Sequence, residues 1–255
     1  MTESKSRTAV EWPPAPGTIR REPAQIHLWA AGVEEFARYL QTFETLLSDS
    51  ERGKAGAFRF AKDRDRYVIR HGLLRLILRR YVGQPAAEIQ FQYGKHGKPE
   101  IILERNGPLF FNASDSGNIA VWAVTPACPV GVDIESIQPI SDARGVARHF
   151  FVERETATLE ALPADAQLAA FYSCWTRKEA LLKATGEGIT ESLKKVEVTV
   201  APDDPPGVAS ISGDAQAGRE WQLQPFSPAS GYLGCLAYRN APLLVFHWRV
   251  SESVL

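Results

Sequence analysis

Gly131-Val132-Asp133-Ile134-Glu135 and, further along the chain, Trp175-Thr176-Arg177-Lys178-Glu179-Ala180-Leu181-Leu182-Lys183 are the two stretches that decide the fold. In the first, apolar side chains alternate with Gly131, Asp133 and Glu135, which is typical of a strand with one buried face. In the second, Trp175, Glu179 and Lys183 are spaced four apart, so they share one face of a helix. If that face meets the strand, three carboxylates and one ammonium group converge.

This convergence of charges predicts a particular chemistry. Like charges repel unless something positive lies between them. Carboxylate oxygens beside a lysine suit Mg²⁺ that holds a phosphate ester. We therefore expect Asp133, Glu135 and Glu179 to hold a metal ion, with Lys183 beside it. An Asp-x-Glu pair alone more often marks a solvated face, and Lys-Glu pairs occur on many helices, so the prediction requires the two segments to meet.

Composition limits the class of protein. The chain has 255 residues, of which 44% are hydrophobic, enough to bury a full core in one large domain or two small ones. The net charge of -1 gives no general case for nucleic acid or membrane as a partner. No apolar stretch is long enough to span a bilayer, and the N-terminus lacks the apolar run of a signal peptide. We expect a cytoplasmic protein with three buried, reduced cysteines.

The proline-containing stretch Pro126-Ala127-Cys128-Pro129 divides the chain into two halves. We expect a flexible arm over 1–21, an N-terminal subdomain over 22–125 and a C-terminal subdomain over 126–255. Apolar periodicity and turn residues predict the following elements: strands over 25–30, 89–93, 99–103, 109–114, 118–125 and 130–135, helices over 33–47, 63–82, 142–149, 153–162 and 165–185, and a strand meander over 193–250.

Together with Gly186-Glu187-Gly188, the two deciding stretches resemble the broad-specificity, surfactin-synthetase type of 4′-phosphopantetheinyl transferase. The linked patterns of that family are Gly-Val/Ile-Asp-Ile-Glu and Trp-x-x-Lys-Glu-Ala/Ser-x-x-Lys. Further similar elements are Gly97-Lys98-Pro99, Phe111-Asn112-Ala113-Ser114, and Phe150-Phe151 followed by Glu155. The resemblance covers about 48–189 in order.

The resemblance implies an α+β fold. Two similar subdomains would be related by a pseudo-twofold, each with a small antiparallel sheet packed against helices, and the site would lie in the cleft between them. The length of the chain fits the family members that work as monomers, whereas shorter relatives assemble trimers from single halves.

The resemblance also implies a reaction. Such enzymes move the 4′-phosphopantetheine arm of coenzyme A onto a serine of an apo acyl or peptidyl carrier protein and release 3′,5′-ADP. Mg²⁺ or Mn²⁺ offsets charge on the pyrophosphate. In the family, residues matching Asp133, Glu135 and Glu179 hold the metal, and a lysine matching Lys183 contacts the pyrophosphate. Glu179 is also a candidate for the base that takes the proton of the serine.

Contacts to the nucleotide of coenzyme A follow from the same resemblance. Either Arg52 or Lys54, together with Arg70, would hold the 3′-phosphate, and Lys98 would lie by the adenine and its phosphates. Cations on a rigid support suit such a ligand. Without the resemblance, a basic helix face and a lysine in a turn are ordinarily just solvated.

One departure from the family pattern concerns the pyrophosphate. The family usually has His after Phe-Asn-x-Ser, but here Asp115 follows Ser114. An ionised carboxylate cannot donate a hydrogen bond and repels phosphate. Three outcomes are open: Asp115 turns away and leaves Ser114 and backbone N–H groups to bind, or it accepts from the adenine amino group or a nearby Arg, or coenzyme A binds more weakly.

Two other functions stay open from the sequence. A metal-dependent phosphodiesterase or nuclease could use the same carboxylates without a carrier protein. A degenerate member of the family could bind coenzyme A or a carrier without transfer, although only Asp115 supports this. The intact triplet of carboxylates and Lys183 favour transfer.

Overall fold

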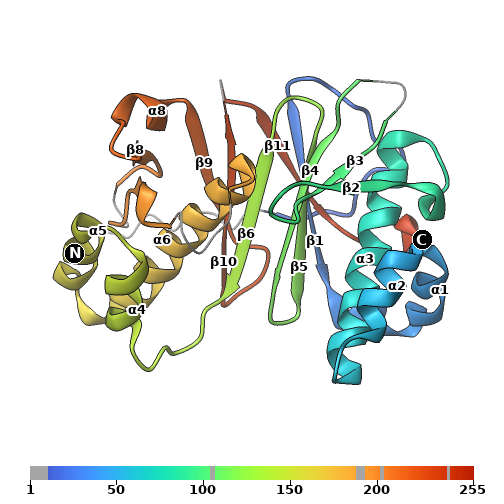
Figure 1. The fold of residues 1–255 in the computed structure, drawn as a ribbon, viewed down its shortest axis with the longest axis horizontal. Coiled ribbons are helices and arrows are strands. Elements are labelled where there is room, and N and C mark those ends of the chain that lie inside the picture. Colours follow the sequence, from blue (N-terminus) through green and yellow to red (C-terminus); the bar gives the residue numbers. More distant parts are fainter. Residues whose placement is uncertain (1–10, 104–106, 188–192, 202–203, 240–241) are drawn as a thin grey trace.

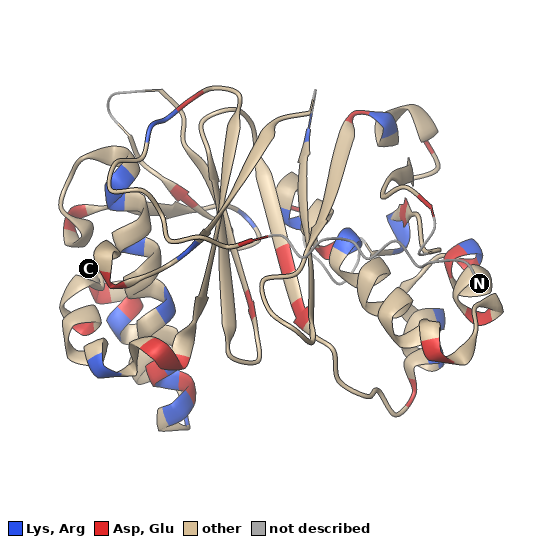
Figure 2. Cartoon of the chain, turned by 180° about the vertical axis from the view of Figure 1, so that it is seen from behind, with Lys and Arg blue, Asp and Glu red and all other residues tan. Residues whose placement is uncertain are grey.

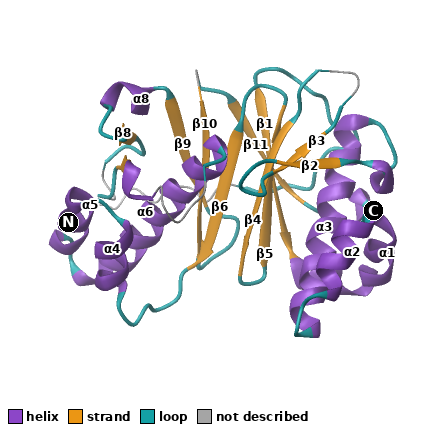
Figure 3. Ribbon diagram, viewed as in Figure 1, coloured by secondary structure: helices purple, strands orange, loops and turns teal. Residues whose placement is uncertain are grey.

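The computed structural model describes residues 11–103, 107–187, 193–201, 204–239 and 242–255. Two sheets stand side by side at its centre, and helices cover the outer side of each (Figures 1 and 3). The structure is therefore a mixed α+β fold with small sheets and helices, as the sequence predicts. None of the helices in the described ranges combines the length and apolar character needed to cross a membrane.

The N-terminal half contains the helices on the right of Figure 1. Its elements are β1 (Gln25–Gly32), η1 (Val33–Tyr39), α1 (Leu40–Leu46), α2 (Asp49–Gly56), α3 (Ala61–Val82), η2 (Ala86–Glu88), β2 (Phe91–Tyr93), β3 (Pro99–Ile101), β4 (Phe110–Ser116) and β5 (Ile119–Thr125). Ser48 and Glu51 form a capping box that begins α2. Gly83, in the left-handed conformation, ends α3 as predicted.

The C-terminal half contains the helices on the left of Figure 1. Its elements are β6 (Val130–Ser136), α4 (Ala143–Phe150), α5 (Glu153–Ala161), α6 (Ala164–Thr185), η3 (Leu193–Lys195), β7 (Val196–Val198), β8 (Val208–Ile211), α8 (Ala215–Arg219), β9 (Trp221–Phe226) and β10 (Tyr232–Arg239), before β11 (Leu244–Arg249) and η4 (Glu252–Val254). The expected helices are present, and α8 interrupts the predicted meander.

The two central sheets have related strand orders. One has the order β11-β1-β5-β4, and the other has the order β6-β10-β9. In the first sheet, β1 pairs with β5, the second strand of the hairpin β4–β5. In the second sheet, β6 pairs in the same way with β10, the second strand of the hairpin β9–β10. Thus β1-β5-β4 and β6-β10-β9 share one connectivity, although the sequence shows no convincing repeat.

The last strand corrects the expectation of a small antiparallel sheet in each half. β11 leaves the C-terminal half and pairs parallel to β1, with Gln25 opposite Leu244 and Ala30 opposite Arg249. Because β1 is buried along almost its whole length, its open edge needs a covering strand. Val250 and Val254 then enter the core that α3 forms with its sheet.

The N-terminal segment contacts this returning strand. Residues 1–10 of the predicted flexible arm lie outside the described residues. In the remainder of the arm, the rings of Trp12 and His247 pack edge to face, with their centroids 5.0 Å apart. The carbonyl of Pro13 accepts a hydrogen bond from the backbone N–H of Arg249, at 2.8 Å. The described part of the arm therefore packs against β11.

The two faces of β6 have separate roles, and this positions the site. Val130, Val132 and Ile134 are buried between the two sheets, as the alternation predicts. The opposite face meets α6. Seen from behind, the central strands carry few charged positions, and acidic segments stand out among them (Figure 2). Because side chains alternate along a strand, Asp133 and Glu135 belong to the face opposite Val130, Val132 and Ile134.

Candidate functional site

Gly131 lets α6 approach β6 closely. A Cβ atom at this position would lie 2.0 Å from the carbonyl oxygen of Ala180 and 2.4 Å from the backbone nitrogen of Ala184. Real Cβ atoms essentially never come that near backbone atoms, so only glycine fits. The two segments that the sequence singled out are therefore packed against each other, and the predicted meeting of strand and helix is confirmed.

Asp133 and Lys183 form the centre of the site. Lys183 Nζ lies 2.7 Å from Asp133 Oδ1 and donates to Ser114 Oγ at 2.9 Å, while Ser114 Oγ donates to Asp133 Oδ1 at 2.9 Å. Asp133 is only 4% exposed, and its second oxygen, Oδ2, is buried without a hydrogen-bond partner in the structure. A buried carboxylate oxygen without a partner is costly, so it is available to a ligand.

Glu135 and Glu179 complete the acidic group. Glu135 Oε2 accepts from Ser116 Oγ at 2.8 Å, and burial raises the pKa of Glu135. The pKa of Glu179 is raised to about 7, first by burial and then by the charge of Asp133, with Glu135 adding to it and Lys183 opposing it. Because the charge of Asp133 raises the pKa of both glutamates, and Glu135 also raises that of Glu179, the three carboxylates lie close enough to interact electrostatically.

Side chains of β4 join the two halves along β6. Asn112 Oδ1 accepts from the backbone N–H of Val132 at 2.9 Å, Ser114 bonds Asp133, and Ser116 bonds Glu135. These three side chains alternate along one strand and therefore share its face. That alternation was the sequence signal for Asn112 and Ser116, which the sequence analysis did not assign to the site.

Lys98 ties the turn between β2 and β3 to the C-terminal half. Its Nζ donates to the carbonyl oxygens of Lys183 at 2.6 Å, Val130 at 3.2 Å and Ala184 at 3.2 Å. The last carbonyls of a helix lack partners within it, and a cation there is stabilising. Burial lowers the pKa of Lys98. Lys98 thus meets the backbone of the same helix end that carries Lys183.

Asp115 pairs with arginines of α3. It forms an ion pair with Arg70, and Arg66 Nη2 lies 3.9 Å from Asp115 Oδ2. Of the outcomes left open by the sequence, the structure has the carboxylate accept from a nearby Arg. Arg70 Nε is buried without a hydrogen-bond partner in the structure, and burial lowers the pKa of Arg70.

Arg52 and Lys54 differ in their surroundings. Arg52 Nη2 lies 2.5 Å from Asp49 Oδ1, and Arg52 also donates to the carbonyl of Leu47. Lys54 Nζ lies 4.5 Å from the ring centroid of Tyr93 on β2. The pKa of His71 is lowered to about 4, mainly by burial, and the charges of Arg70 and Lys54 contribute to the lowering, so both cations lie near this ring.

Comparison with known proteins agrees with this arrangement. The family model described as "4′-phosphopantetheinyl transferase superfamily" matches residues 129–237, and the one described as "4′-phosphopantetheinyl transferase, N-terminal" matches residues 28–127. The 4′-phosphopantetheinyl transferase HetI of Nostoc sp. is 36% identical over 76% of this chain and 82% of its own length. The chain belongs to the 4′-phosphopantetheinyl transferase family.

Two relatives from bacilli extend the comparison. The 4′-phosphopantetheinyl transferase psf-1 of Bacillus pumilus is 36% identical over 65% of this chain and 69% of its own length. The 4′-phosphopantetheinyl transferase Sfp of Bacillus subtilis is 29% identical over 64% of this chain and 70% of its own length. The chain is thus an enzyme of the holo-[carrier-protein] synthase type, and its family uses coenzyme A as a substrate.

The residues present fit the metal ion that the family implies. Within the five described ranges, no three Asp, Glu, His or Cys side chains are already gathered in a geometry that could hold a metal. The donor set is nonetheless that of a hard cation: three carboxylates, one with the free buried oxygen Asp133 Oδ2. In the structure, the ammonium of Lys183 supplies the positive charge beside Asp133.

Other predicted features lie apart from this group. Lys178, the neighbour of Glu179 in the second stretch, is fully buried and pairs with Glu155. Gly188 of the Gly-x-Gly element lies outside the described residues. A hollow of about 190 Å³ borders Lys98, Asn112 and Lys183, and Gly186 closes α6 beside it.

Proposed function

We propose that this transferase moves the 4′-phosphopantetheine arm of coenzyme A onto a serine of an apo acyl or peptidyl carrier protein and releases 3′,5′-ADP. The observation that carries the proposal is the contact of Asp133 with Lys183 and Ser114 at the junction of the two halves, where the charge of Asp133 also acts on Glu179. Carboxylates and an ammonium group, partly buried at this junction, suit a diphosphate that must be bound in place and polarised for attack.

Asp133, Glu135 and Glu179 are the residues suited to hold Mg²⁺ or Mn²⁺. When bound, the ion would offset charge on the pyrophosphate oxygens. The free oxygen of Asp133 and the raised pKa values of both glutamates support this assignment, because each indicates a carboxyl group short of positive charge.

Glu179 and Lys183 have separate roles in the transfer. Glu179 is the proposed base: its carboxylate, ionised when it holds the metal ion, can accept the proton of the carrier serine. The pKa of about 7 belongs to the metal-free protein, in which no cation offsets the neighbouring carboxylates beyond Lys183. The Lys183 ammonium, whose side chain is 20% exposed, can donate to a pyrophosphate oxygen after leaving Asp133. Attack by the serine oxygen on the β-phosphate then breaks the bond to the leaving 3′,5′-ADP.

The nucleotide of coenzyme A would lie over the N-terminal half. Lys54 and Arg70, whose charges both act on His71, are suited to the 3′-phosphate. Arg70 would have to leave Asp115 to bind it, and Arg52 would have to leave Asp49 and the carbonyl of Leu47. Lys98, Ser114 and Asp115 border the same region. This assignment gives the 22–125 subdomain the nucleotide contacts and the 126–255 subdomain the metal site.

A pseudo-twofold relation between the halves is part of the proposal. Arg80 and Lys183 each lie three residues before the glycine that ends their helix, and Arg80 lies 5.5 Å from the ring centroid of Trp29. Trp29 occupies the place on β1, three residues before its end, that Asp133 occupies on β6. We infer one active site per chain, in a cytoplasmic monomer of the surfactin-synthetase type.

One assay tests the function. The protein is incubated with coenzyme A, Mg²⁺ and an apo carrier protein, and the carrier is weighed by mass spectrometry. A gain of the phosphopantetheine mass that is lost in Asp133→Asn supports transfer. Cleavage of phosphate esters without any gain would support the phosphodiesterase alternative, and binding of coenzyme A without gain would support the degenerate one.

A further inference from the structure

Each half of the molecule has a buried cation at the same position on its long helix. The helices α3 and α6 both have 22 residues and both end at a glycine in the left-handed conformation. Arg75 and Lys178 occupy the same place, eight positions before Gly83 and Gly186 respectively (83 − 75 and 186 − 178). Arg75 is 1% exposed and Lys178 is 0% exposed.

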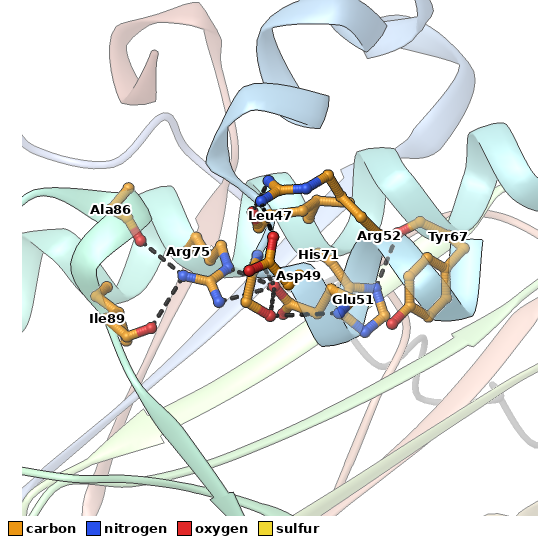
Figure 4. Close-up of polar contacts among 10 residues, drawn as sticks. Leu47, Asp49, Glu51, Arg52, Tyr67, His71, Arg75, Ala86 and Ile89 are labelled. Carbon is orange, nitrogen blue, oxygen red and sulfur yellow. Dashed lines mark hydrogen bonds and ion pairs between the residues drawn. The ribbon is translucent and has the colours of Figure 1, made fainter. Parts of the chain in front are cut away.

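Arg75 joins its own helix to two other segments, as Figure 4 shows. Its Nη2 lies 2.7 Å from Glu51 Oε2, and its Nε donates to the same oxygen at 2.9 Å. Its Nη1 donates to the carbonyls of Ala86 at 2.9 Å and Ile89 at 3.0 Å. Glu51 also accepts from the backbone N–H of Ser48, so α2, α3 and the connection to β2 meet at one guanidinium.

Lys178 forms the matching contact in the C-terminal half. It pairs with Glu155, and it donates to the carbonyl of Val196 at 2.6 Å, just after η3. Glu155 accepts from Val152 N–H at 2.9 Å at the start of α5, as Glu51 does from Ser48 at the start of α2. The two clamps are therefore equivalent, but only the first lies beside α2 and the β2–β3 turn.

We propose that Arg75 is a positioning residue for the nucleotide part of coenzyme A; this inference rests on the function proposed above. Glu51 is followed directly by Arg52 and Lys54 on the same short helix. The carbonyl of Ile89 lies two residues before β2, whose Tyr93 contacts Lys54, and the turn that follows carries Lys98. One guanidinium thus fixes the spacing between the cation on α2 and the cation on the β2–β3 turn.

The chemistry of the clamp favours positioning over stability. A buried ion pair loses much of its Coulomb energy to desolvation, so it contributes little net stability compared with packed apolar side chains. A guanidinium, however, offers five donors in a rigid fork and can hold a carboxylate and two carbonyls at fixed angles. A lysine has one nitrogen and cannot hold all three in that geometry.

The test measures the binding of adenosine 3′,5′-bisphosphate by calorimetry, with KM for coenzyme A and kcat measured alongside. Two variants break the clamp: Arg75→Lys keeps the charge, and the double variant Arg75→Met with Glu51→Leu replaces the buried pair by apolar side chains so that the core can still pack. The matched control is Lys178→Met with Glu155→Leu, which breaks the equivalent clamp away from the nucleotide.

We expect both Arg75 variants to bind the nucleotide about 10-fold more weakly and to raise KM for coenzyme A by a similar factor, because losing one well-aligned hydrogen bond to a charged group has an effect of about this size. The value of kcat should change little, because the reacting groups on β6 and α6 stay in place. The control should bind the nucleotide as the wild type does. Folded Arg75 variants with wild-type affinity, or an equal loss in the control, would overturn the inference. A wild type that neither binds the nucleotide nor modifies a carrier would overturn the proposed function as well.

Discussion

Gly131→Ala tests whether the close packing of α6 on β6 aligns the site. The new Cβ would lie 2.0 Å from the carbonyl oxygen of Ala180, and ordinary contact begins at 3.4 Å, so strand and helix must separate by about 1.4 Å. If Lys183 moves with its helix, its distance of 2.7 Å from Asp133 Oδ1 lengthens to about 4 Å, beyond a hydrogen bond.

Two measurements follow from this displacement. Forcing a methyl group into a packed contact costs about 1–3 kcal/mol, which we expect as a lower free energy of unfolding in denaturant titrations. Misplacing Glu179 and Lys183 relative to Asp133 by about 1 Å should lower kcat for carrier modification on the order of 100-fold. The rate is measured as carrier mass gained per unit time at saturating coenzyme A and Mg²⁺.

Gly56→Ala is the matched control. A Cβ at Gly56, the last residue of α2, would meet nothing within 4 Å. Alanine there should stabilise the protein by no more than about 1 kcal/mol and leave kcat unchanged. If Gly131→Ala also kept the stability and kcat of the wild type, the close approach of α6 to β6 would not be what aligns the site.

Three further predictions concern single side chains. Asp115→His, which frees Arg70 and removes a negative charge near the phosphates, should keep or tighten the affinity for coenzyme A in calorimetry; a large loss would mean that the carboxylate helps binding. Lys98→Met leaves three carbonyls without their donor and should lower the melting temperature and raise KM for coenzyme A; an unchanged melting temperature would contradict the role of Lys98 between the halves. In metal-free buffer, the pKa of Glu179 in the folded protein is about 7, above its ordinary value of 4.5. Between about pH 4.5 and 7 the native state therefore keeps a proton that the unfolded state has lost, and stability falls as pH rises through this range. Glu179→Gln should flatten that part of the plot of melting temperature against pH, and identical plots for wild type and variant would exclude the shift.

Local sequence patterns predicted the parts of the fold that depend on local periodicity. Alternation placed Asp133 and Glu135 on one face of β6, and a spacing of four placed Glu179 and Lys183 on one face of α6. Turn chemistry gave the end of α3 at Gly83. The strand β11 was predicted as a strand but not in its parallel pairing with β1, because long-range partners leave no periodic signal.

The contacts that sequence reasoning missed are those between distant segments. Arg75 stands among apolar residues of α3 and Glu51 stands in a capping box, which together signal a buried pair, yet neither reveals the other as its partner. The family resemblance predicts that Lys98 lies by the nucleotide, but nothing in the sequence predicts that its ammonium group donates to the carbonyls at the end of α6. Tertiary packing decides such contacts, and spacing along the chain does not encode them.

Electron paramagnetic resonance of Mn²⁺, recorded in the presence of coenzyme A, measures whether Asp133 and Glu179 hold a divalent ion. We expect one bound ion per chain in the wild type, much weaker binding in Asp133→Asn and in Glu179→Gln, and unchanged binding in Glu153→Gln, which removes a carboxylate at the start of α5. Equal Mn²⁺ binding by the wild type and all three variants would mean that these carboxylates do not hold the metal.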